Sequence, residues 1–188
     1  MKNLPDESLR MVDWYGSRFD VPVLQTRAFR YGIPLTWLFG LQPDNRGGVS
    51  QWSKEYRDKY QGKHDDVSEL WTNRGSFPRP HLESLAVLMG LPGKVEIDGS
   101  KVYETWKTIP VNAEAAKSID LYCMQDVIQT AFVFQRYHYL AGRLTLEKYR
   151  AAATSLLNWT SEAPGQAAFA AKIDRAAVLI EDAVVPST

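Results

Sequence analysis

The longest stretch of this sequence that contains neither glycine nor proline lies between Pro110 and Gly142, and residues Asn112 to Ala141 fall within it. Its apolar residues recur at the spacing of one helix face, and Gly142 supplies a stop, so we predict one long helix here. Tyr122 and Asp126 lie four residues apart in this stretch, which places both on the same face, one turn apart. A buried helix has little reason to carry a phenol and a carboxylate side by side, unless the two groups address a common target.

The composition is typical of a globular domain, with 45% hydrophobic and 23% charged residues. Basic and acidic residues both number 22, so any nucleic-acid contact must come from a local patch rather than from net charge. The single cysteine, Cys123, excludes an intramolecular disulfide and favours a reducing compartment, which predicts a cytoplasmic protein. No apolar run approaches the ~18 residues of a membrane span, and the first ten residues lack the apolar core of a secretory signal. We therefore expect no membrane association.

Local patterns predict a mixed α/β chain. Residues 9–16 favour a strand, and a helix follows with Asp20 as its cap, Pro22 in its first turn and Gly32 as its stop. Residues 40–63 show no stable period and are interpreted as a surface excursion without regular structure. A second strand begins at His64, and further helices are predicted at residues 81–90, 98–108, 145–159 and 165–184. Two strands rarely organise an α/β core, so we expect part of the sheet to be missing.

Acidic residues occur at three separate points of this chain. Asp20 follows the first strand, where carboxylates of α/β proteins tend to meet ligands, and Asp66 belongs to the second strand. Asp126 is accompanied by Tyr122 on the long helix. Carboxylates are the oxygen ligands that Mg²⁺ and Mn²⁺ prefer. The pattern predicts hydrolysis of a phosphodiester by two metal ions, with a phenol that orients the attacking water.

Four blocks of the sequence carry a family resemblance. In chain order they are WYGSRFDVPVLQTRAFRYGIP, HDDVSEL, LESLAVLMGLPGK with DGSKVYETW, and YCMQDVIQTAFVFQRYHYLAGRLTLEKY. Together they resemble predicted 3'-5' exonucleases related to the proofreading domain of family B DNA polymerases, the tyrosine-bearing subclass of the DEDD superfamily. The resemblance implies an α/β, ribonuclease H-like exonuclease fold. It implies an exonuclease-like domain over residues 1–150 and a C-terminal helical extension over 151–188.

The resemblance also implies roles for single residues. Asp20 corresponds to the carboxylate of the second motif, and Tyr122 and Asp126 correspond to the tyrosine and carboxylate of the third. These three are the expected catalytic residues, with Asp20 and Asp126 as ligands of Mg²⁺ or Mn²⁺ in a two-metal site. Asp66 is expected to support the site, and Tyr15 stands where the family usually has asparagine. The implied activity is removal of nucleotides from the 3' end of single-stranded DNA.

One departure from the family bears on both fold and activity. The family begins with an Asp-x-Glu pair on its central strand, and no such pair precedes Asp20. We therefore expect a sheet that is incomplete at its N-terminal half, and weak or no nuclease activity by the isolated chain. An upstream segment, a partner chain or homo-oligomer that completes the sheet, and repacking under the C-terminal helices all remain open. Glu181 and Asp182 are adjacent, so on a strand they would face opposite ways and could not replace the pair.

The same residues also have simpler interpretations that involve no catalysis. Asp20 could simply be a helix cap, Cys123 a buried apolar residue, and Tyr122 with Asp126 an ordinary pair on a helix. The whole chain could be a non-catalytic nucleic-acid-binding or scaffold module derived from the same fold. Aromatic and basic residues of the excursion could stack bases and hold phosphates, or simply form a solvated loop. The candidates for nucleic-acid binding are Trp52, Lys54, Arg57, Lys59 and Lys63.

Overall fold

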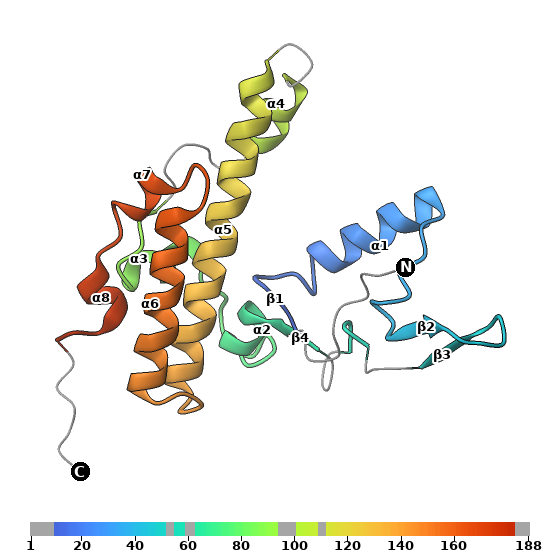
Figure 1. Cartoon of the computed structure of the whole chain (residues 1–188), viewed down its shortest axis with the longest axis horizontal. Helices are drawn as coiled ribbons and strands as arrows, with labels where there is room; N and C mark the ends of the chain where they lie inside the picture. The colour runs from blue at the N-terminus through green and yellow to red at the C-terminus, as the bar shows by residue number, and fades with distance from the viewer. Residues whose placement is uncertain (1–9, 52–54, 59–62, 94–100, 109–111, 183–188) are drawn as a thin grey trace. The chain divides into compact units, whose positions relative to one another are not determined.

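The computed structural model describes residues 10–51, 55–58, 63–93, 101–108 and 112–182 (Figure 1). The chain divides into two compact units, Met1–Arg79 and Pro80–Thr188.

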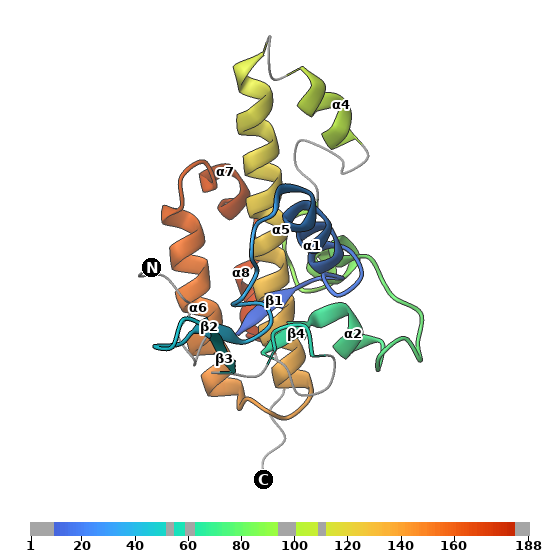
Figure 2. The ribbon, with the colours of Figure 1, turned by 90° about the vertical axis from the view of Figure 1, so that its right-hand side faces the viewer.

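The first unit contains a parallel pair of very short strands. β1 (Met11–Asp13) pairs with β4 (His64–Asp66), with Asp13 opposite Asp66 in the register (Figure 2). β1 is followed by helix α1 (Asp20–Tyr31), and β4 leads directly into α2 (Val67–Trp71). Because parallel strands end at the same edge, the segments after β1 and β4 start close together.

Helix α1 confirms most of its sequence prediction. Pro22 lies in its first turn, and Gly32 ends it in the left-handed conformation at φ 63°. The predicted cap at Asp20 is wrong, because the cap position is Phe19 and Asp20 is already the first helical residue. The chain begins to wind before that point, since the amide of Phe19 already donates to the carbonyl of Tyr15.

The excursion contains a hairpin that the sequence analysis missed. β2 (Leu41–Pro43) and β3 (Val49–Gln51) pair antiparallel. Asp44 closes the turn, because its Oδ1 accepts hydrogen bonds from the amides of Arg46 and Gly48, both at 2.8 Å. Strands of three residues are too short to show an alternating pattern, which is why periodicity did not reveal them.

A small apolar cluster supports this unit. Val21, Leu38 and Tyr56 are buried together, and Met11, Leu35, Trp37 and Phe39 pack against them. Val21 is the residue that ties α1 to this cluster. The start of α1, and with it Asp20, is therefore fixed by apolar packing next to the strand ends.

The second unit is helical and is built on α5 (Ala113–Leu140). Asn112 caps α5 by accepting from the amide of Glu114, which confirms the predicted long helix. α3 (Leu82–Leu88), α4 (Val102–Lys107) and α6 (Leu146–Glu162) pack against it, with α6 alongside in Figures 1 and 2. The largest fully buried side chains of this unit include Ile128, Phe132, Tyr149, Leu157 and Phe169.

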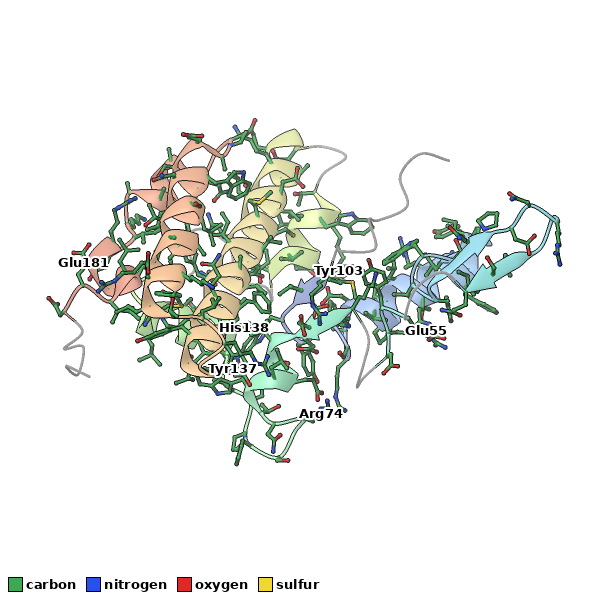
Figure 3. All side chains as sticks on the ribbon, turned by 60° about the horizontal axis from the view of Figure 1, so that its bottom comes forward. Glu55, Arg74, Tyr103, Tyr137, His138 and Glu181 are labelled. Carbon is green, nitrogen blue, oxygen red and sulfur yellow. The ribbon has the colours of Figure 1, made fainter. Side chains whose placement is uncertain are left out.

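The C-terminal segment differs from its prediction. Residues 165–184 do not form one helix; α7 (Ala167–Ala170) and α8 (Arg175–Leu179) are separate. Asp174 interrupts the pattern because its side chain caps α8 by accepting from the amide of Ala177. Glu181 follows α8 in a turn rather than in a strand (Figure 3). Cys123, expected to be buried, is exposed.

The fold is mixed α/β with small sheets and many helices, as the sequence predicted. The ribonuclease H-like sheet and its incompleteness stay predictions. So does the boundary at residue 150, which lies within α6. In the described part of the chain, no helix combines the length and the apolar character needed to cross a membrane.

Candidate active site

Acidic side chains gather where β1 and β4 end. Asp13 and Asp66 close the two parallel strands side by side, and Asp20 stands in the first turn of α1. In open α/β sheets, ligands bind beyond the carboxyl ends of parallel strands. The first unit therefore places two of the predicted residues, Asp20 and Asp66, at the edge where a ligand is expected.

Asp66 organises this edge through hydrogen bonds. It caps α2 by accepting from the amides of Ser68 and Glu69, and its oxygens also accept from the amides of Tyr15 at 2.9 Å and Ser17 at 3.1 Å. The side chain is buried, with 5% of the residue exposed. Burial by itself raises the pKa of Asp66, but the bonds from Ser68 and from the backbone outweigh it and leave the pKa below its usual value. Asp66 is thus a charged residue that fixes the loop before Asp20.

Tyr15 lies in that loop with a left-handed backbone, at φ 68°. This conformation costs a non-glycine residue about 1–2 kcal/mol, and asparagine tolerates it better than most. The guanidinium carbon of Arg79 lies 3.4 Å from the centroid of the Tyr15 ring and helps to hold it. The loop geometry thus accounts physically for the asparagine expected at this position, while a supporting role for Tyr15 in catalysis stays a prediction.

A second carboxylate contact was missed by the sequence analysis. Nε2 of His64 lies 2.7 Å from Oδ2 of Asp13, with the histidine side chain 5% exposed. Oδ1 of Asp13 accepts from the amide of Gly16 at 3.0 Å. A Cβ atom at Gly16 would overlap the Asp13 carboxylate, so a larger residue there would displace that carboxylate from its present position. No short motif marks this pair, because it depends on the register of β1 against β4.

Asp20 experiences the charge of its neighbours. Its pKa is raised, first by partial burial and then by the negative charge of Asp13, with a smaller contribution from Asp66. The nearby Asp65 is bound by Arg10 through two hydrogen bonds of 2.7 and 3.0 Å. Asp20 is the carboxylate at this edge that remains exposed. A cation would relieve the repulsion that raises its pKa.

In the second unit, α5 carries Tyr122 and Asp126 one turn apart, as predicted. Both residues are half-buried, and the neighbouring Ile128 is in the core at 1% exposure. Partial burial of the otherwise exposed Cys123 raises the pKa of its thiol, and the charges of Asp126 and Asp120 raise that pKa further. A cysteine in this state is a poor nucleophile. The candidates for chemistry on this helix are therefore the phenol and the carboxylate.

Comparison with known protein families identifies the family of this chain. Residues 2–173 match the family described as predicted 3'-5' exonuclease related to the exonuclease domain of PolB. The chain belongs to this exonuclease family. No curated protein and no solved structure gives a significant match. Membership implies a nucleic-acid substrate, and the family typically uses divalent metals. The match also extends past residue 150, to 173.

The described side chains show how far this chain can hold the divalent metals that the family typically uses. Within the described residues, no three or more His, Cys, Asp or Glu side chains are grouped so as to hold a metal ion. Asp20 belongs to the first unit and Asp126 to the second. Two carboxylates are fewer ligands than a pair of ions needs. Neither unit therefore forms a complete metal site from its own described residues.

The nucleic-acid contacts predicted in the excursion are only partly described. Trp52, Lys54 and Lys59 lie outside the described residues. Arg57 makes an ion pair of 2.9 Å with Glu55, and its guanidinium lies 4.2 Å from the centroid of the Phe39 ring. Lys63 is half-buried, and its carbonyl accepts from the amide of Met11 at 2.7 Å. A role for these residues in binding stays a prediction.

Proposed function

We propose that this exonuclease-family chain acts at the 3' ends of single-stranded DNA. In this proposal Asp20 and Asp126 are ligands of Mg²⁺ or Mn²⁺, and the hydroxyl of Tyr122 orients the attacking water by a hydrogen bond. The observation that carries the proposal is the family match over residues 2–173, which spans both units and hence all three residues. The acidic edge around Asp20 supports it, because that edge favours a bound cation.

The proposal includes a requirement for further ligands. Asp20 and Asp126 supply two carboxylates, and we infer that additional acidic ligands come from a segment outside this sequence, from a partner protein or from another copy of this chain. By itself the chain is then expected to bind a divalent ion weakly and to hydrolyse DNA slowly or not at all. A cytoplasmic location stays a prediction.

Metal binding and nucleotide release test this proposal together. Mn²⁺ binding to the full chain is followed by electron paramagnetic resonance, and release is measured from 3'-labelled single-stranded DNA. Asp20→Asn and Asp126→Asn should each weaken Mn²⁺ binding and abolish whatever release occurs. Asp120→Asn is the matched control, because Asp120 is exposed on the same helix but on another face. Equal Mn²⁺ affinity in all three variants, or release that persists in EDTA, would contradict the proposal.

A second candidate is a nucleic-acid-binding module without catalysis. The small number of acidic ligands favours it, because Asp20 and Asp126 alone are fewer carboxylates than a pair of metal ions needs. This candidate predicts DNA binding in EDTA that survives Asp20→Ala. The exonuclease proposal instead predicts that the metal strengthens binding and that Asp20→Ala removes the gain.

A further inference from the structure

A line of exposed residues runs the length of α1. Asp20, Leu24, Arg27 and Tyr31 occupy positions i, i+4, i+7 and i+11 of the helix, and all four are exposed. At about 100° per residue these positions fall within roughly 60° of one another, so they share one face. We call this set the α1 stripe. It begins at the acidic edge and ends at Tyr31, the last residue of α1, the helix labelled in Figure 1.

The far end of the α1 stripe is basic and aromatic. The guanidinium carbons of Arg27 and Arg30 lie 5.7 and 5.5 Å from the centroid of the Tyr31 ring. Among the ion pairs between described residues, none involves Arg27 or Arg30. After Asp20, α1 contains no acidic residue. Two positive charges therefore flank one aromatic ring, without a carboxylate to neutralise them.

Stabilisation of α1 explains only part of the cluster of two arginines and one tyrosine at its C-terminal end. Cations near a helix C-terminus are stabilising by about 0.3–1 kcal/mol, which would explain the arginines. It does not explain why Tyr31, an aromatic residue of the stripe, is 58% exposed. Exposed aromatic faces among arginines are what proteins use to hold single-stranded nucleic acid, with bases stacked on rings and phosphates on cations.

We propose that a single strand of nucleic acid lies along the α1 stripe, with Arg27 and Arg30 on its phosphates and a base stacked on Tyr31. The inference rests on the proposed function, because it places the 3' end of the strand at Asp20. Eleven residues of α-helix span roughly 16 Å, which is about five nucleotides at the 3.4 Å spacing of a stacked strand. Tyr31 thus meets the strand upstream of the terminal nucleotide.

Binding in EDTA tests the stripe separately from catalysis. The full chain is titrated against 5'-fluorescein oligothymidylates of 3 and 12 nucleotides, and anisotropy is recorded at several salt concentrations. Arg27→Gln with Arg30→Gln should weaken binding of the 12-mer about tenfold or more. It should also reduce the slope of log K against log salt by about 1.4, the value for two lost phosphate contacts on a single strand.

Tyr31→Ala distinguishes stacking from charge. It should weaken 12-mer binding about tenfold while leaving the salt slope unchanged, because stacking releases no counterions. The 3-mer covers only part of the stripe, so each change should weaken its binding less than that of the 12-mer. Arg46→Gln is the matched control, since Arg46 is an exposed arginine of the same unit in the β2–β3 turn. Circular dichroism confirms that each variant is folded.

The outcomes separate this inference from the proposed function. Equal weakening by the Arg46 variant, an unchanged salt slope in the double variant, or equal loss for 3-mer and 12-mer would overturn the stripe. Loss of self-association in the double variant with unchanged DNA affinity would assign the stripe to protein contact and also overturn it. Binding that depends on the stripe, in a chain whose Mn²⁺ affinity is the same in the Asp20→Asn, Asp126→Asn and Asp120→Asn variants, would contradict the proposed function and leave the stripe standing.

Discussion

Residues 10–79 and residues 80–182 are stabilised by different kinds of contact. In the first region the strands are three residues long, and the loop before α1 is held by the carboxylate of Asp66. In the second, long helices bury large apolar side chains such as Phe132, Leu157 and Phe169. The region with the acidic edge therefore depends on an ionised hydrogen-bond acceptor in addition to a small apolar cluster, whereas the helical region depends mainly on the burial of large apolar side chains.

The largest expected effect is a loss of packing in the second region. Phe132 is 0% exposed on α5, so Phe132→Ala should lower the free energy of unfolding by about 3–5 kcal/mol. Urea unfolding followed by circular dichroism at 222 nm measures the loss. Val127→Ala is the control, because Val127 lies on the same helix and is 61% exposed. A loss in the control equal to that in Phe132→Ala would contradict the contrast.

The next effect should appear in the first region. Asp66→Ala leaves the amides of Tyr15, Ser17 and Ser68 without their acceptor, so it should cost about 2–4 kcal/mol. Faster hydrogen exchange at the Tyr15 and Ser17 amides would locate the damage. Asp65→Ala is the control, because its pair with the exposed Arg10 is worth at most about 1 kcal/mol.

The pH dependence of this second change follows from the lowered pKa of Asp66. Its stabilising contribution is fully present above the usual aspartate pKa of about 3.9 and is lost as pH falls through the lower folded-state value. The difference between wild type and Asp66→Ala should therefore shrink in acid. A difference that stays constant from pH 7 to pH 2 would show that the charge of Asp66 is not what holds the loop.

The smallest effect concerns the polar contacts that hold α8. The Tyr149 hydroxyl donates to the carbonyl of Val178 and accepts from Nε of Arg136 at 2.9 Å. Tyr149→Phe removes both bonds and should cost about 1–2 kcal/mol. Thermal unfolding measures the change, with Tyr103→Phe, at an exposed position, as the control.

The same tyrosine gives the second region the opposite pH dependence. Burial raises the pKa of Tyr149, so its folded state resists ionisation and stability falls as pH rises above the usual tyrosine value of about 10. Tyr149→Phe should flatten that alkaline loss, and Tyr103→Phe should not. If Tyr149→Phe instead changed the acid side of the curve, the division between the two regions would be wrong.

The success of the sequence predictions followed the length of each element. α5 and α6 were predicted because many turns of apolar spacing agree with their caps at Asn112 and Thr145. β2 and β3 were missed because three residues carry no period. The 165–184 helix was wrong because the side chain of Asp174 caps a new helix inside an apparently continuous pattern.

Some residues of the candidate site were also predicted from the sequence, whereas others became apparent only in the structure. Its residue types came from patterns and from the family resemblance, and Asp20, Tyr122 and Asp126 stay predictions for catalysis. Asp13 and His64 were not found as a pair, because they are 51 residues apart and meet only through strand register. The sequence also did not predict that Asp66 accepts hydrogen bonds from the loop before α1. The donors of those bonds, the amides of Tyr15 and Ser17, are distant from Asp66 in the sequence.

The amino-acid sequence by itself determined the family, the long helix and the positions of the carboxylates, because these follow from local periodicity and from the order of motifs. Tertiary structure decided which carboxylates remain exposed. Asp66 and Asp20 are equivalent in the sequence, but distant backbone amides surround one and lower its pKa, whereas burial and neighbouring charges raise the pKa of the other. The pKa of an ionisable group depends on the groups that folding places next to it. Local sequence patterns do not predict which groups these are.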